Sequence, residues 1–373
     1  MLLEATAMDQ ERAPLDEFYD RLHKTGPEFR GFLSNHGPMV VEAMVRHGHD
    51  DAVLQWLDGY VQRLEPFPSS SEPIGSDWRQ ALGDVRRVGD WTRYFEKSLA
   101  EQPWPTTLNV WWPRLLPGIA AGATHGVIRV GHAVRTLTTD GESPLRIREL
   151  AHGLAYWASR WQSVSIPSNF WESRSQEESR PSHHNSWAIA LGLDHLPRLE
   201  PLERDEGGGL DGWISRMAEI SGWPDLVYGT QIPENPEDIL LWLAHVVDAA
   251  VIHYRDYGHG NGIMMVHSVT APNAVWRALP ALDRHWWRAS AFAAWIATAS
   301  LTTIYASRFP MERTRLREIS PTIPTPEDTF ARAVDHGDEH VIKFADTALD
   351  VYARTQDSRA LAAVYQVGSL IKP

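Results

Sequence analysis

Four histidines in separate helix-like stretches are the residues of this chain best suited to metal chemistry. Neutral imidazole is a ligand for iron, zinc, copper and nickel. The chain has no cysteine, so any metal must be held by nitrogen and oxygen ligands. Histidines from distant helices that meet in one interior predict a metal centre. The four histidines lie in largely apolar segments: Ser34-Asn35-His36-Gly37-Pro38-Met39, Ala123-Thr124-His125-Gly126-Val127-Ile128, Met264-Met265-Val266-His267-Ser268-Val269-Thr270 and Asp338-Glu339-His340-Val341-Ile342-Lys343.

Lys343 follows His340 by three positions and is a rare residue type in this chain, in which nearly all basic residues are arginine. One interpretation is an exposed ion pair between Glu339 and Lys343, which contributes roughly 0.2–0.5 kcal/mol at this spacing. The other is a buried lysine with a lowered pKa, whose neutral amine can react with carbon dioxide. The resulting carbamate would be an anionic oxygen ligand that offsets the charge of a metal held by neutral imidazoles.

Spacing alone does not select these four histidines, because others lie in similar surroundings. A histidine on an apolar helix face is more often a hydrogen-bonded core residue than a ligand. An iron site with two histidines and one carboxylate, using Asp248, Asp338 or Glu339, fits the sequence equally well. The competing histidines are His132, His152, His245, His253 and His259.

The elements that must position these residues are helices. Apolar residues recur at helical spacing in most of the chain, and strand-like alternation is scarce. We therefore predict an all-α protein, with residues 1–373 forming one large multi-helix domain around the site. Thr325 and Pro326 form a strong helix start, and we expect His340 and Lys343 in the interior of that helix. The clearest helical segments are Val40 to Tyr60, Ile147 to Trp161, Ile239 to Tyr254 and Thr329 to Tyr352.

Composition excludes several classes of partner. The formal net charge of −13 argues against nucleic acid, whose binding relies on clustered Lys and Arg. Residues Met1 to Ala5 lack the features of a signal peptide, so we expect a cytoplasmic protein. The uncharged stretch from Ala289 to Ser307 is rich in Ala, Ser and Thr, which favours a buried core helix over a membrane span. The glycines at 207, 209 and 212 follow an acidic segment, not a strand, so we expect no flavin or NAD(P) site there.

Taken in order, the four histidine segments resemble the successive motifs of the questin oxidase-like family. The resemblance spans nearly the whole chain and includes His125-Gly126-Val127-Ile128-Arg129-Val130-Gly131 and Asp338-Glu339-His340-Val341-Ile342-Lys343. Members of this family act oxidatively on aromatic polyketides such as anthraquinones. One branch resembles a non-heme iron dioxygenase whose metal is held by four histidines and a carboxylated lysine. The resemblance therefore implies Fe(II), with His36, His125, His267 and His340 as imidazole ligands and Lys343 as the carbamate.

The same resemblance suggests further site residues. Thr270, three residues after His267, would lie near the metal with its hydroxyl. The sequence is similar to a shorter bacterial branch, in which Arg129 and His132 stand where fungal members have a histidine and a tyrosine. These two residues are candidates for binding an acidic phenol or enolate, although the favoured interpretation is an ion pair on the helix surface for Arg129 and a hydrogen-bonded core histidine for His132.

The function expected from the resemblance is an oxygenase that uses O2 on a small aromatic polyketide. The reaction would be oxidative ring opening or oxygen insertion of the Baeyer-Villiger type. Two alternatives stay open at this point. A carbamylated lysine with histidines can also hold a hydrolytic metal pair, and a helical protein can bind aromatic metabolites with no metal at all.

Overall fold

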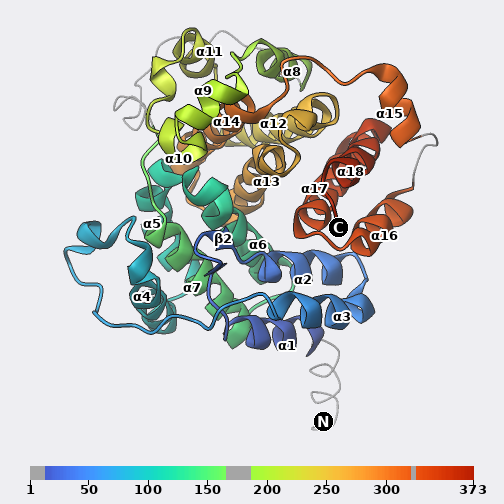
Figure 1. Cartoon of the computed structure of the whole chain (residues 1–373). Coiled ribbons are helices and arrows are strands. Elements are labelled where there is room, and N and C mark those ends of the chain that lie inside the picture. Colours follow the sequence, from blue (N-terminus) through green and yellow to red (C-terminus); the bar gives the residue numbers. More distant parts are fainter. Residues whose placement is uncertain (1–12, 165–185, 321–324) are drawn as a thin grey trace.

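The computed structural model describes residues 13–164, 186–320 and 325–373, and the regular secondary structure of these residues is almost entirely helical (Figure 1). The prediction of an all-α fold is confirmed. The elements in chain order are α1 (Ala13–Leu22), β1 (Glu28–Phe29), β2 (Leu33–Ser34), α2 (Gly37–Arg46), α3 (Asp50–Val61), α4 (Val88–Glu101), α5 (Trp104–Leu115), α6 (His125–Thr139), α7 (Pro144–Ser159), α8 (Ser186–His195), α9 (Pro201–Glu206), α10 (Gly209–Trp213), α11 (Trp223–Tyr228), α12 (Pro236–Tyr257), α13 (Gly262–Ala278), α14 (Trp287–Tyr305), α15 (Arg313–Ile319), α16 (Pro326–His336), α17 (Glu339–Thr355) and α18 (Ser358–Leu370).

Short 3-10 helices connect several of these elements, and the antiparallel strands β1 and β2 form a small hairpin directly before α2. The 3-10 segments are Trp78–Ala81, Val85–Arg87, Leu116–Gly118, Ala121–Thr124, Met217–Glu219, Gly258–Gly260, Leu279–Ala281 and Arg284–Trp286.

Four helices form a closed ring at the centre of the protein. Helix α2 packs against α6, α6 against α13, α13 against α17, and α17 against α2. Figure 1 shows α2 (blue), α6 (green), α13 (orange) and α17 (red) meeting in the middle of the molecule, although they come from distant parts of the chain. The ring therefore brings together segments separated by more than 200 positions.

Helix α6 makes close backbone contacts with α13, its neighbour in the ring, and with α7 outside the ring. A methyl group built on Gly131 would lie 2.6 Å from the Cβ and 2.7 Å from the Cα of Ala274 in α13. A methyl group on Gly126 would lie 2.7 Å from the Cα of Trp157 in α7. Both positions need glycine because only a hydrogen atom fits between the helices.

The predicted helix across residues 329–352 is in fact two helices. Thr325 caps α16 as expected, with its hydroxyl accepting a hydrogen bond from the backbone of Asp328. Gly337, with φ of +80°, then ends α16. Asp338 caps α17, so that His340 and Lys343 lie in the first turns of a new helix. The expectation that both residues lie inside the helix begun at Pro326 was therefore wrong, because a left-handed glycine followed by a capping Asp favours a break.

The segment Val40 to Tyr60 is also divided, into α2 and α3, at Gly48, which has φ of +76°. The stretch from Ala289 to Ser307 lies mostly within α14, whose residues are buried from Ser290 onward, as predicted. No helix among the described residues is both long and apolar enough to cross a membrane. Residues Met1 to Ala5, on which the expected location rests, lie outside the described residues.

Candidate metal centre

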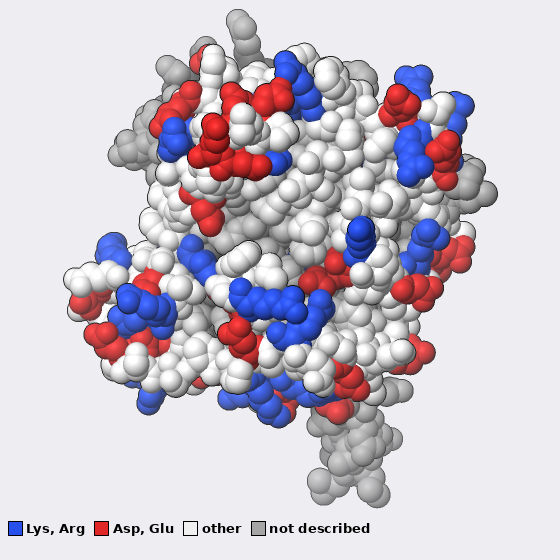
Figure 2. Space-filling view, viewed as in Figure 1, with Lys and Arg blue, Asp and Glu red and all other residues white. Residues whose placement is uncertain are grey.

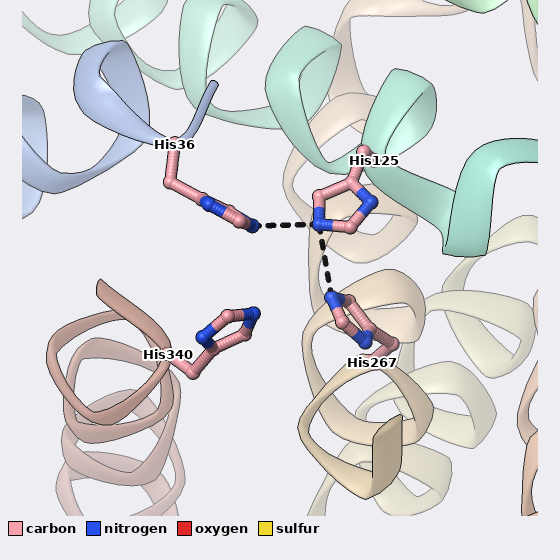
Figure 3. Close-up of side chains that lie close together, drawn as sticks. All are labelled: His36, His125, His267 and His340. Atoms are coloured by element: carbon pink, nitrogen blue, oxygen red, sulfur yellow. Dashed lines mark hydrogen bonds between the residues drawn. The ribbon is translucent and has the colours of Figure 1, made fainter. Parts of the chain in front are cut away.

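The imidazoles of His36, His125, His267 and His340 point toward one another at one end of the helix ring (Figure 3). Each offers a ring nitrogen, and these four atoms all lie within 4.8 Å of one another. All four residues are buried, and His267 is only 1% exposed. The structure thus brings together the four histidines that the resemblance implied.

Three of these histidines are at helix beginnings. His36 precedes the first residue of α2, His125 is the first residue of α6, and His340 is the second residue of α17. The helix beginnings direct partial positive charge toward the cluster, which stabilises an anionic group there. His267 lies further along α13, on the side that faces α6.

The ring of His125 has a fixed tautomer. Its Nδ1 lies 2.6 Å from the backbone oxygen of Gly122. A carbonyl oxygen only accepts hydrogen bonds, so Nδ1 carries the proton and donates it. Burial, followed by the charge of Lys343, holds the pKa of His125 well below its usual value, so the ring is neutral. Its Nε2 is therefore a bare lone pair that faces the cluster.

This lone pair has two close neighbours. The Nε2 of His36 is 2.7 Å away, and the Nε2 of His267 is 3.0 Å away. One lone pair accepts one proton well, so hydrogen bonding satisfies at most one of these contacts. A shared cation satisfies both, because two ligand nitrogens at about 2.1 Å from a metal and at right angles lie about 3.0 Å apart. The donor set therefore fits a metal ion.

Strained backbone precedes His125. Gly122, Ala123 and Thr124 all have positive φ, and for Ala123 and Thr124 the values are 51° and 65°. Such conformations cost about 1–3 kcal/mol each in residues other than glycine, and they persist where the surroundings enforce them. Here they turn the carbonyl of Gly122 toward the imidazole. In the sequence, the only signal for this turn is a glycine between two alanines, so local pattern did not predict it.

A carboxylate orients the ring of His340, and a second carboxylate lies near the ring of His36. The Nδ1 of His340 lies 3.3 Å from the carboxylate of Asp338, which also accepts from the backbone N–H of His340 at 2.8 Å. The Nδ1 of His36 faces Glu339 at 3.6 Å. Acidic partners behind metal-binding imidazoles fix the ring orientation and raise ligand basicity. Asp338 and Glu339 thus lie behind the imidazoles, whereas the sequence left them open as direct ligands.

Lys343 is completely buried, and its Nζ has no hydrogen-bond partner among the described residues. Burial lowers its pKa to about 7, although Glu339 and Asp338 act in the opposite direction. Its charge is also among the causes that lower the pKa of His36, His125 and His267, after burial. The alternative of an exposed ion pair with Glu339 is overturned, because Glu339 contacts His36 and Arg63 instead.

The other three candidate site residues have partners of their own. The hydroxyl of Thr270 donates to the backbone oxygen of Val266 at 3.1 Å, in the turn before it on α13. Arg129 donates to both carboxylate oxygens of Glu149, at 2.6 and 2.9 Å. Within the described part of the chain, Arg129 makes no hydrogen bond to the imidazole cluster.

His132 lies two helical turns beyond His125 on α6, and its Nδ1 is 2.7 Å from Glu42. Burial lowers the pKa of His132, although Glu42 opposes this shift. The structure therefore joins Arg129 and His132 to buried carboxylates that the sequence analysis did not identify. Only the tertiary contacts reveal Glu42 and Glu149 as their partners.

Comparison with known proteins agrees with this geometry. No curated protein and no solved structure matches the chain. The model of one family, described as questin oxidase-like, matches residues 33–348, a range that contains all four histidines and Lys343. Membership of this family implies an oxidoreductase, of the oxidase or oxygenase kind found in polyketide metabolism. The chain therefore belongs to the questin oxidase-like family.

Proposed function

We propose that this protein is a non-heme iron oxygenase that opens an aromatic ring of a polyketide such as an anthrone or hydroquinone. The observation that carries the proposal is the convergence of three Nε2 atoms, at 2.7 and 3.0 Å, beside a buried lysine without a hydrogen-bond partner. Bound iron(II) would supply the activation of O2, which side chains alone do not provide. As a dioxygenase reaction, both oxygen atoms enter the product and no external reductant is needed.

The residues of the chain have defined tasks in this proposal. His36, His125, His267 and His340 hold the metal through neutral nitrogens. The carbonyl of Gly122 keeps Nε2 of His125 free of a proton, and Asp338 orients the ring of His340. Burial of the whole cluster excludes water, which strengthens electrostatic interactions within it.

Lys343 would contribute a negative charge to the site. Its neutral amine attacks carbon dioxide, a nitrogen–carbon bond forms, and one proton leaves to solvent. A pKa of about 7 makes the neutral amine abundant at physiological pH. The carbamate would then offset part of the metal charge, and the beginnings of α2, α6 and α17 favour an anion at this place.

In Figure 2 the area above the centre of the molecular face carries mainly residues other than Lys, Arg, Asp and Glu, and charged residues of both signs surround it, including a group of Lys and Arg just below the centre. The proposal includes no nucleic-acid or membrane partner, and it places the activity in the cytoplasm.

The test combines metal analysis with an oxygen assay. Protein purified without chelator or metal-affinity resin should contain iron, and it should consume O2 with an anthrone or hydroquinone. His267→Ala and Lys343→Ala should lose turnover while circular dichroism shows an intact fold. Full activity with unchanged metal content in both variants would refute the site. Activity that persists without O2 would indicate the hydrolase instead.

A further inference from the structure

A second buried layer of polar residues lies across the same four helices that hold the histidines. Every helix of the ring contributes to it, and the layer contains carboxylates, guanidinium groups and one imidazole. Its members are Glu42 on α2, His132 and Arg135 on α6, Arg277 on α13, and Asp346 and Asp350 on α17. We refer to these residues as the ion-pair layer.

The contacts in the ion-pair layer run from helix to helix. Arg135 of α6 donates to Glu42 of α2 at 2.7 Å and to Asp346 of α17 at 3.1 and 3.2 Å. Arg277 of α13 donates to the same Asp346 at 2.7 Å and to Asp350 at 2.5 Å. Arg46, the last residue of α2, also donates to Asp346. Asp346 of α17 therefore joins the other three helices of the ring directly, and Arg135 adds a second connection between α6 and α2.

Asp346 is the centre of the layer. It is completely buried, and it also accepts from Arg46 at 2.7 Å and contacts His47 at 3.0 Å. Burial alone would raise the pKa of Asp346, but Arg135 and Arg277 hold it well below its usual value. The carboxylate is therefore charged and fully paired.

The layer lies at a regular position relative to the histidines. Glu42 follows His36 by six positions, and Asp346 follows His340 by six, which corresponds to about 9 Å along a helix axis. On α6 and α13, Arg135 and Arg277 each follow the histidine of their helix by ten positions, or about 15 Å. All four helices thus run in the same sense, from the imidazole cluster to the ion-pair layer.

The layer is not itself a second metal site. Glu42, His132 and Asp346 are close enough to hold a cation. However, the guanidinium of Arg135 lies among them and contacts both carboxylates. The negative charge that would attract a metal is therefore already neutralised.

Stability alone does not explain such a layer. Desolvation of buried ion pairs offsets most of their attraction, and well-packed apolar side chains are often at least as stabilising. What paired and directional hydrogen bonds provide is one particular arrangement of the groups that they join. In this protein they join the four helices on which the metal ligands depend.

We propose that the ion-pair layer is a positioning device, which fixes the rotation and axial position of the four helices so that their imidazoles converge. This inference rests on the proposed metal centre. The residues of the layer do not touch the metal or the substrate. They act through the helices, so their loss changes the distances between ligand nitrogens by small amounts to which metal affinity is sensitive.

The test compares two Arg→Met variants. Arg277→Met removes the guanidinium that joins α13 to α17. The control is Arg146→Met, because Arg146 is also buried and pairs with Asp16 at 2.9 Å, but it lies on α7 outside the ring. Affinity for Co(II) is measured by competition with a coloured chelator, and the unfolding midpoint is measured on the metal-free proteins.

We expect both variants to lose stability but only Arg277→Met to bind Co(II) about tenfold or more weakly, with a changed Co(II) absorption spectrum. Equal affinity in wild type and folded Arg277→Met would overturn the positioning role. If Arg277→Met does not fold, Arg277→Lys decides the question. Lysine keeps the charge, but its side chain is one bond shorter than the arginine side chain, whose Nη2 contacts both Asp346 and Asp350. Reduced affinity of Arg277→Lys then supports the role, and wild-type affinity overturns it. Wild-type protein that binds no Co(II) would refute the metal centre itself.

Discussion

The Nε2 atoms of His36 and His125 lie 2.7 Å apart, although the other ring nitrogen of His125 already donates its proton to Gly122. His125 therefore offers a lone pair, not a proton, at this contact. Since His267 approaches the same lone pair at 3.0 Å, the three rings form a donor set that fits one ion. The strained turn before His125 places the carbonyl that fixes its ring, and the carboxylate of Asp338 orients the ring of His340.

Metal should stabilise the folded protein through the histidine cluster. At a free metal concentration 100 times the dissociation constant, the free energy of unfolding should increase by about 2.7 kcal/mol. His125→Ala should remove this increase, while His253→Ala should retain it, because His253 is equally buried but lies on α12 outside the cluster. Thermal unfolding with and without Fe(II), under anaerobic conditions, measures the effect. A metal-induced shift that survives in His125→Ala would contradict the assignment.

Lys343→Met should make the metal-free protein more stable and the metal site weaker. The buried Nζ has no hydrogen-bond partner among the described residues, and such a group costs about 1–3 kcal/mol. Methionine has similar length and no polar atom, so the free energy of unfolding should rise by about this amount at pH 7. The gain should shrink as the pH rises from about 7 toward 10.5, because the folded lysine is neutral there and the unfolded one still binds a proton.

Denaturant unfolding of metal-free wild type and Lys343→Met between pH 7 and pH 10 checks this prediction. Iron content of the same two proteins, purified in bicarbonate buffer, provides the second measurement. A variant that is less stable than wild type at pH 7 would show that Lys343 makes favourable contacts in the metal-free protein.

Glu149 should make the protein sensitive to acid. Burial raises the pKa of this carboxyl, but Arg129 and His23 outweigh burial and lower it to about 2. In the unfolded chain the pKa of Glu149 is near 4.5, so the ion pair stabilises the folded state fully above that pH. This stabilisation is lost as the pH falls through the folded-state pKa of about 2. The contribution is about 3 kcal/mol. Glu149→Gln should flatten the dependence of unfolding free energy on pH between 4.5 and 2, and an unchanged slope would argue against the ion pair.

Arg129→Met should behave as a stability mutation, since it leaves the buried carboxylate of Glu149 without its main partner. Removing one member of a buried pair costs about 3–5 kcal/mol. Urea unfolding at pH 7 measures this loss. The double variant Arg129→Met with Glu149→Leu should recover part of it. If Arg129 instead contacts the substrate, the double variant will recover stability, but its KM for the substrate will stay higher than that of the wild type.

Gly131→Ala should push α6 and α13 apart. The added methyl group would meet the Cα and Cβ of Ala274 at 2.7 and 2.6 Å, and overpacking of this kind costs about 1–3 kcal/mol. His125 and His267 lie on these two helices, so Co(II) affinity should fall as well. Gly59→Ala is the matched control. Its methyl group meets nothing within 4 Å, and alanine should stabilise helix α3 by about 0.5–1 kcal/mol.

Much of the helical fold could be predicted from local sequence. The periodicity of apolar residues identified helices such as α7 and α12, because a helix face repeats every few residues and leaves a local pattern. The uncharged stretch from Ala289 to Ser307 indicated α14. The helix start at Thr325 and Pro326 was equally local. The break at Gly337 and Asp338 was also encoded locally, but the continuing apolar pattern on both sides concealed it.

The residues of the candidate site could not be predicted from local sequence pattern alone. Residue types and spacing left seventeen histidines to choose from, and the resemblance to a family selected four of them. Three contacts depend on how distant helices pack. His36 meets His125, which is 89 positions away, Arg129 pairs with Glu149, and His132 pairs with Glu42. The sequence by itself determined that the protein is helical, has no thiol ligands and contains histidines on apolar faces. Only the tertiary structure decided which imidazoles share a centre and that Lys343 is buried without a partner, because contacts between distant helices leave no periodic signal in the chain.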